Sequence, residues 1–216
     1  MILAAGCSIA HGQGTVVERY DLENCKFSFP NLIADKLGVI CNNIAYPANS
    51  NEEIFHNVLE ELDNNSYTYC LVSWTSLSRE IWKTSTGRWA FNLNYASYYD
   101  NDSFDVFVDR SDLDNVVSTD KHKLKLVQNC LNTVKIKVTN DDFETKLRHY
   151  KSVLSVICNN KGIKLLQIDA IKNDNTSNLY LLEPKLFKNP RGSELHPPKE
   201  SHEFWADDMF EKFYAK

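Results

Sequence analysis

Short apolar runs alternate along this chain with longer segments of helical periodicity. The apolar runs lie at residues 1–5, 39–44, 69–74 and 163–168, and they predict four buried strands. The run at 69–74 is apolar on both faces, as strands of a parallel sheet are. Strands that alternate with helices predict a parallel sheet covered on both sides, with right-handed crossovers.

The predicted helices carry apolar residues at every third or fourth position. Gly38 ends the first of them, and Ser50 with Glu53 forms a capping-box pattern that begins the second, which reaches Leu62. Gly162 ends the helix before the last strand. The predicted helices are residues 29–37, 51–62 (Ile54, Val58, Leu59 and Leu62 inward), 120–134, 141–160 (Phe143, Leu147, Tyr150, Leu154 and Ile157 on one stripe) and 199–214 (Phe204, Trp205, Met209 and Phe213 available to pack).

Residues 78–118 interrupt this alternation with a polar stretch that has no clear period. We interpret the stretch as an insertion over the edge of the sheet within a single domain of residues 1–216. Its aromatic side chains either pack the insertion onto the body or form a stacking platform for sugar rings or acyl chains. They are Trp82, Trp89, Phe91, Tyr95, Tyr98 and Tyr99.

Composition narrows the class of protein. A chain of 216 residues with 43% hydrophobic content and a net charge of -5 fits one globular domain. It contains neither an apolar run of membrane-spanning length nor a secretory signal pattern, so we expect a soluble cytoplasmic protein without membrane contact. Mild acidity argues against nucleic-acid binding, and the basic cluster at 121–125 fits the solvated side of a helix.

The six cysteines are scattered and show no zinc-site spacing, and several fall within apolar runs. We therefore expect buried free thiols. They are Cys7, Cys25, Cys41, Cys70, Cys130 and Cys158.

The residues that could take part in catalysis lie at one edge of the predicted sheet. Reactive groups in such folds collect beyond the carboxyl ends of the strands. Four segments reach that edge: Ser8, the turn at 47–50, the segment 74–79 and the loop before the last helix. Ser8 follows a buried strand on a turn that Gly6 permits, which suits a nucleophile, and His196 on a distant loop could take its proton.

The other histidines fit structural roles better. His11 is close to Ser8 in sequence but awkwardly aimed as a base, and we expect His202 to make a structural hydrogen bond. His56, His122 and His149 lie on predicted amphipathic helices, where solvent exposure is the ordinary explanation.

Four sequence blocks resemble those of the SGNH (GDSL-like) hydrolases, especially divergent members found in tailed bacteriophages. The blocks occur in the family's order and span nearly the whole chain, which makes the ordered set more specific than any single block. They are Gly6-Cys7-Ser8; Asn43-Ile44-Ala45-Tyr46-Pro47-Ala48-Asn49-Ser50-Asn51; Ser73-Trp74-Thr75-Ser76 with Arg79; and Glu194-Leu195-His196-Pro197 with His202 and Trp205-Ala206.

The resemblance implies a flavodoxin-like three-layer α/β/α sandwich with a central parallel sheet, and neither a metal nor an organic cofactor. It also implies that Ser8 is the nucleophile, that His196 is the general base, and that an acid just upstream, Glu194, orients the imidazole. Oxyanion and substrate-binding groups would come from the second and third blocks: Ala48, Asn49, Thr75, Trp74 and Arg79. Trp74 could instead belong to the core, and Arg79 could instead pair with Glu80 or Glu53.

The chain departs from the family pattern at three positions. Ser193 stands where members often have aspartate, Ala48 replaces a glycine whose N–H joins the oxyanion hole, and Thr75 replaces an asparagine donor. Alanine keeps the N–H but resists a positive φ. We therefore carry two hypotheses: a serine esterase acting on a carboxylic ester, such as an O-acetyl or acyl ester of a carbohydrate, and an impaired module used in carbohydrate binding or as a structural component. A nucleotide binder ranks last because the glycines match no phosphate-loop spacing.

Overall fold

The computed structural model describes residues 1–17, 21–77, 79–84, 87–92, 107–109, 116–117, 140–170, 180–181 and 196–214. Its central sheet has the strand order β2-β1-β3-β8-β9, and every neighbouring pair is parallel. Counted along the chain this order is 2-1-3-4-5, which is the flavodoxin-like arrangement. The strands are β1 (Ile2–Ala5), β2 (Cys41–Asn43), β3 (Tyr69–Trp74), β8 (Lys164–Asp169) and β9 (Tyr180–Leu181).

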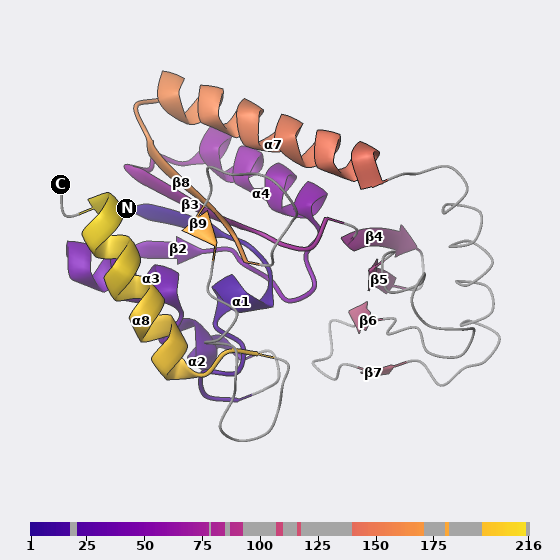
Figure 1. Ribbon diagram of the computed structural model, residues 1–216, viewed down its shortest axis with the longest axis horizontal. Helices are drawn as coiled ribbons and strands as arrows, with labels where there is room; N and C mark the ends of the chain where they lie inside the picture. The colour runs from indigo at the N-terminus through magenta and orange to yellow at the C-terminus, as the bar shows by residue number, and fades with distance from the viewer. Residues whose placement is uncertain are drawn as a thin grey trace.

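Helices cover both faces of this sheet, so the fold is a three-layer α/β/α sandwich (Figure 1). One face carries α4 (Asn51–Asn64) and α7 (Asn140–Asn160), and the other carries α3 (Phe29–Leu37) and α8 (Lys199–Met209). A π-helical turn, η2 (Phe210–Tyr214), continues α8. Two short helices, α1 (Ser8–His11) and α2 (Leu22–Cys25), lie between β1 and α3.

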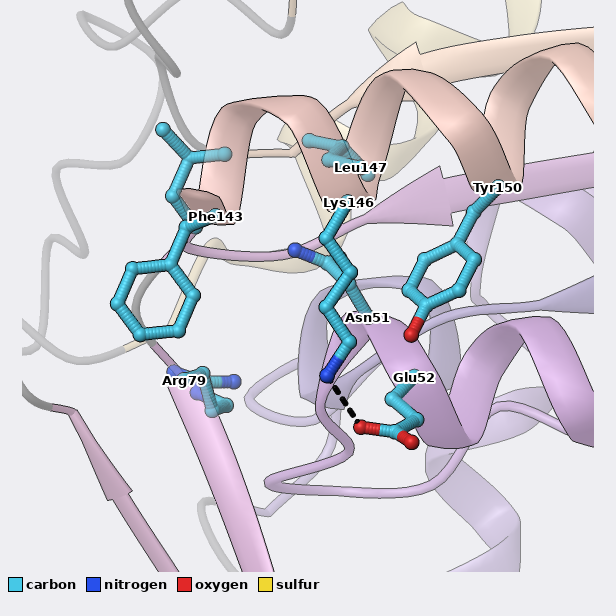
Figure 2. A pocket seen from close by; sticks show the side chains of 8 residues that line it. Asn51, Glu52, Arg79, Phe143, Lys146, Leu147 and Tyr150 are labelled. Carbon is cyan, nitrogen blue, oxygen red and sulfur yellow. Dashed lines mark hydrogen bonds and ion pairs between the residues drawn. The ribbon is translucent and has the colours of Figure 1, made fainter. Parts of the chain in front are cut away.

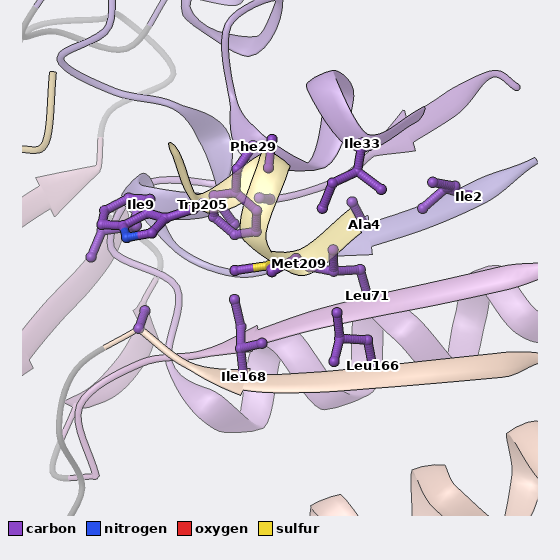
Figure 3. Close-up of a cluster of buried hydrophobic side chains, with 14 of the residues drawn as sticks. Ile2, Ala4, Ile9, Phe29, Ile33, Leu71, Leu166, Ile168, Trp205 and Met209 are labelled. Atoms are coloured by element: carbon purple, nitrogen blue, oxygen red, sulfur yellow. The ribbon is translucent and has the colours of Figure 1, made fainter. Parts of the chain in front are cut away.

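Alternation along β1 divides the core between the two faces. Ile2 and Ala4 join the cluster under α3 and α8, whereas Leu3 and Ala5 join the cluster under α4 and α7. All four side chains are fully or almost fully buried, because successive side chains of a strand point to opposite faces and both faces are covered. Figure 3 shows Trp205 and Met209 of α8 packed over the first of these clusters.

The structure confirms the predicted strands and most of the predicted helices. Ser50 caps α4, since its side chain accepts a hydrogen bond of 3.2 Å from the Glu53 N–H. The second strand begins two residues later than its apolar run, at Cys41. One expectation is wrong in detail: Phe204 of α8 is 48% exposed and points away from the core that Trp205 and Met209 fill.

The insertion holds more regular structure than its sequence suggested. It contains an antiparallel sheet in the order β4-β5-β6-β7, where the sequence showed no period. The predicted helix at 120–134 and its basic cluster lie outside the described residues. None of the described helices has the length and hydropathy needed to cross a membrane. The strands of the insertion are β4 (Arg79–Thr84), β5 (Gly87–Asn92), β6 (Phe107–Asp109) and β7 (Val116–Val117).

A buried ion pair joins α7 to the end of the sheet. The Lys151 Nζ lies 3.0 Å from the Asp169 carboxylate, and the two side chains are 10% and 5% exposed. Burial lowers the pKa of Lys151, which the nearby Asp169 charge partly offsets. Such a pair fixes geometry, and removal of one partner weakens the compensation of the charge that stays buried.

We therefore expect Lys151→Met to lower the free energy of unfolding by about 3 to 5 kcal/mol, measured by urea denaturation. Lys212→Met is the matched control, because Lys212 pairs with Asp208 at the surface, and it should cost less than about 1 kcal/mol. Equal effects of the two variants would contradict the structural weight given to the Lys151–Asp169 pair.

Candidate functional site

The order of the strands reverses at β1, which lies between β2 and β3. In open parallel sheets ligands bind beyond the carboxyl ends of the strands at such a switch point. The chain leaves β1 there through Gly6 and Cys7 and enters α1, whose first residue is Ser8. The topology of the sheet therefore places Ser8 where a reactive group is expected.

The turn into α1 requires a glycine at position 6. A Cβ built on Gly6 would lie 2.6 Å from the Ala10 Cβ and 3.0 Å from both the Cβ and the carbonyl oxygen of Ser73. Any side chain at position 6 would therefore push α1 away from β3. Ser8 itself is half-buried, and as the first residue of a helix it has a backbone N–H with no intrahelical acceptor.

A strained turn lies in the second sequence block. The Asn49 N–H donates to the Tyr46 carbonyl at 3.2 Å, which closes a four-residue turn with Pro47 and Ala48 at its centre. The third position of this turn has a φ of 63°, and it is occupied by Ala48, the one non-glycine residue with positive φ in the described part of the chain. A type II turn with proline at the second position demands this conformation and normally uses glycine. Strain of this kind is concentrated at functional sites.

Hydrogen bonds hold this turn against the segment that precedes Ser8. The Gly6 carbonyl accepts from the Tyr46 N–H at 3.2 Å and from the Asn49 side-chain amide at 3.2 Å. The side chain of Asn49 is buried and holds Gly6, which gives it a positioning role, and its contact with substrate stays a prediction. The Ala48 N–H and the start of α1 are thereby brought to the same edge of the sheet.

The third block differs most from the sequence expectation. Thr75 is fully buried, and its backbone is held by Asn51, whose Oδ1 accepts from the Thr75 N–H at 2.9 Å. The Asn51 amide also donates to the Thr75 carbonyl at 3.3 Å. Sequence analysis missed this role of Asn51, although it lies within the second block and begins α4.

Trp74 was predicted as a substrate-binding residue with a core position as the alternative, and the structure supports the alternative. Its side chain is fully buried among the residues under α4 and α7, and its indole N–H donates to the Gln167 side chain at 3.0 Å. The physical reason is its place on a central strand, where both faces of the sheet are covered.

His196 lies against the loop that follows α1. A Cβ built on Gly14 would lie 2.7 Å from the His196 Cβ, and Gly14 has a φ of 92°, so no other residue fits there without strain. His196 also affects the pKa of His11 in α1. The chain thus brings His196 to the helix that begins with Ser8. Glu194 and Ser193 lie outside the described residues, and the hydrogen bond from Ser8 to His196 stays a prediction.

Two buried histidines flank this position. Burial lowers the pKa of His11 to about 4 and that of His202 to about 3. The His202 Nδ1 accepts from the Phe29 N–H at 3.2 Å, which confirms the expected structural hydrogen bond. Both rings are therefore neutral near pH 7. His56 and His149 are solvent-exposed as predicted, and His122 lies outside the described residues.

Arg79, at the start of β4, lines a small hollow beside the first turn of α4 (Figure 2). Asn51 lines the hollow and also bonds the third block, so the hollow adjoins the site that was predicted. Of the expected thiols, Cys7, Cys70 and Cys158 are free and buried, Cys25 and Cys41 are free and half-buried, and Cys130 is not described.

Comparison with known proteins adds structural neighbours. No family model matches the chain, and no curated protein matches it. The esterase EstA from a Pseudoalteromonas species is 10% identical, with a TM-score of 0.48 over 97% of this chain and 94% of its own. A protein described as a G-D-S-L family lipolytic protein, from Desulfitobacterium hafniense, is 7% identical, with a TM-score of 0.48 over 95% of each chain.

A variant of the acetylxylan esterase Axe2 from Geobacillus stearothermophilus is 12% identical, with a TM-score of 0.40 over 100% of this chain and 94% of its own. By their names, the solved structures to which this chain is similar are esterases and lipolytic proteins. Because these TM-scores are low, we base the proposed function on this chain's own residues.

We expect Ala48→Gly to raise the free energy of unfolding by roughly 0.5 kcal/mol. The variant removes left-handed strain of about 1 to 2 kcal/mol, and the greater freedom of glycine in the unfolded chain offsets about 0.4 to 1 kcal/mol of that gain. Ala48→Val should destabilise by about 1 to 3 kcal/mol, since a β-branched residue tolerates positive φ poorly. Urea denaturation measures both, and a stabilising valine would contradict the assigned turn.

His202 should make stability depend on pH. Its pKa of about 3 in the folded protein lies below the usual 6.5, so the unfolded chain binds more protons between these values. Stability is therefore fully present above pH 6.5 and falls as the pH drops toward 3, by up to about 1.4 kcal/mol per pH unit for one proton.

His202→Gln keeps an acceptor for the Phe29 N–H but cannot titrate, so the slope of stability against pH should become shallower in this window. Denaturant midpoints measured from pH 7 to pH 4 report the slope. The slope that remains includes a contribution from His11. A slope unchanged from that of the wild-type protein would contradict the buried neutral state of His202.

Proposed function

We propose that this protein is a serine hydrolase of carboxylic esters, with Ser8 as the nucleophile and His196 as the general base. The observation that carries this proposal is the positive φ of Ala48, in a turn that is hydrogen-bonded to the residues before Ser8. A fold tolerates such strain where the surroundings require it, and an Ala48 N–H that binds the oxyanion would be such a requirement.

The reaction follows from these positions. His196 takes the Ser8 hydroxyl proton as Oγ attacks the ester carbonyl, and the backbone N–H groups of Ser8 and Ala48 donate hydrogen bonds to the resulting oxyanion. His196 then gives the proton to the departing alcohol, which leaves an acyl group on Ser8. Water, deprotonated by His196, attacks that acyl group, and the acid departs with Ser8 restored. Glu194 is the proposed partner of the far nitrogen of His196.

The substrate that we favour is an O-acetyl or short acyl ester of a carbohydrate, which agrees with the resemblance of the sequence blocks.

A second candidate is an impaired hydrolase that binds carbohydrate or serves as a structural component. The burial of Thr75 and Asn49 favours it, because neither side chain is then an oxyanion donor in the described arrangement. The loss of one such donor slows turnover by about a hundredfold to a thousandfold. We rank this candidate second because Ala48 keeps its strained positive φ, which is the observation that supports the esterase.

A fluorophosphonate probe tests the nucleophile. We expect the wild-type protein to be labelled on Ser8, because an activated serine attacks phosphorus, and we expect Ser8→Ala to lose the label. His196→Gln should slow labelling by roughly a hundredfold or more, since the general base is absent. Mass spectrometry of the intact protein and of its peptides measures the label.

Ser152→Ala is the control, because Ser152 is exposed on α7 and bonds the Arg148 carbonyl. Its labelling should equal that of the wild-type protein. Equal and poor labelling of the wild-type protein and Ser8→Ala would overturn the esterase proposal and favour the second candidate.

A further inference from the structure

Asn24, in the short helix α2, is fully buried and uses both ends of its side-chain amide to hold a loop. Its Oδ1 accepts from the backbone N–H groups of Val16 and Val17, each at 3.0 Å. Its Nδ2 donates to the Val17 carbonyl, also at 3.0 Å. The loop at 12–17, which follows α1, is therefore fixed to α2 by one side chain.

This loop forms the surface against which His196 lies. The Gly14 N–H donates to the Val17 carbonyl at 3.0 Å, and that carbonyl also accepts from the Asn24 amide. A Cβ built on Gly14 would lie 2.7 Å from the His196 Cβ and 3.3 Å from the Pro197 carbonyl oxygen. The path from the Asn24 amide to His196 thus consists of two hydrogen bonds to one carbonyl and one close backbone contact.

The two ends of the loop are held by different groups. At its start the Gln13 N–H donates to the Ser8 carbonyl at 3.0 Å, which ties this end to α1. At its other end the Asn24 amide holds residues 16–17. The contact with His196 lies between these ends. Loss of the Asn24 amide should therefore displace His196, whereas Ser8 keeps its place on α1.

The chain after His196 has its own attachments near α2. The Lys199 Nζ lies 4.2 Å from the centroid of the Phe27 ring, and the His202 Nδ1 accepts from the Phe29 N–H at 3.2 Å. Neither contact uses the loop at 12–17. The start of α8 should therefore stay in position when the loop is released, and the change should be confined to the surroundings of the His196 ring.

We propose that Asn24 is a positioning residue for the general base, and that it keeps the imidazole of His196 directed at Ser8 by holding the loop at 12–17. This inference rests on the proposed esterase function for the roles of Ser8 and His196. Because Asn24 is fully buried, it acts on the reaction only through the residues that it holds. A displacement of about 1 Å in a catalytic group can slow a reaction by about a hundredfold.

Labelling of Ser8 by a fluorophosphonate measures the effect on the reaction. We expect Asn24→Ala to lower the second-order rate constant of labelling by about tenfold to a hundredfold. Asn24→Asp should recover part of this loss and be slowed by about threefold to tenfold. Its carboxylate still accepts from the N–H groups of Val16 and Val17, and only the donation to the Val17 carbonyl is lost.

Asn42→Ala is the matched control, because the Asn42 amide also makes side-chain hydrogen bonds, to Glu61 at 3.1 Å and to Tyr67 at 2.6 Å. Glu61 belongs to α4, which covers the face of the sheet opposite to α3 and α8. This variant loses similar bonding at a distance from the loop, so it should be labelled within about twofold of the wild-type rate.

A double-variant comparison separates positioning of His196 from a general loss of structure. In His196→Gln the base is already absent, so addition of Asn24→Ala should change the labelling rate by less than about twofold. If Asn24→Ala does not fold, Asn24→Asp takes its place in the comparison. Full multiplication of the two single effects in the double variant, or a wild-type labelling rate in the Asn24 variants, would overturn the proposed role.

NMR of the His196 ring tests the inference without any reaction. The loss of one imidazole signal in His196→Gln assigns that signal. Asn24→Ala should shift it, and Asn42→Ala should leave it in place. A shift of this kind in a protein whose Ser8 is not labelled would remove the esterase and keep the placement of His196 by Asn24. Labelling of Ser8 that the Asn24 variants do not change would remove the positioning role and leave the esterase.

Discussion

The close approach of three segments around Gly6 is the constraint on which the candidate site depends. Because Gly6 has no Cβ, α1 can lie close to Ser73 of β3. A Cβ added at position 6 would lie only 2.6 Å from the Cβ of Ala10. The Gly6 carbonyl then holds the neighbouring turn through Tyr46 and Asn49. One backbone residue thus sets the distance between the start of α1 and the second sequence block.

Burial decides which imidazole near this site can accept a proton. His11 and His202 have lowered pKa values because they are desolvated, and protonation of either would place a charge in the core. His196 is half-buried on the loop that contacts Gly14. Because the two buried rings are neutral near pH 7, neither places a positive charge beside His196.

The sequence predicted those features that follow from periodicity and from turn chemistry. The apolar run at 69–74 and the stripe from Phe143 to Ile157 both became the expected elements, because burial against a sheet requires those patterns. The β4–β5 hairpin was missed, since charged and aromatic residues alternate there without a clear apolar face. The hydrogen-bond partners of Trp74 and Asn49 could not be predicted, because Gln167 and Gly6 lie far away from them in the sequence.

The crystal structure of a phosphonate adduct would test the central claim most directly. Our account predicts a covalent bond from Ser8 Oγ to phosphorus, with a phosphoryl oxygen within about 3 Å of the Ala48 backbone nitrogen. The His196 ring should lie within hydrogen-bond distance of Ser8 Oγ or of the remaining oxygen. An adduct on another residue, or a phosphoryl oxygen directed away from Ala48, would contradict the account.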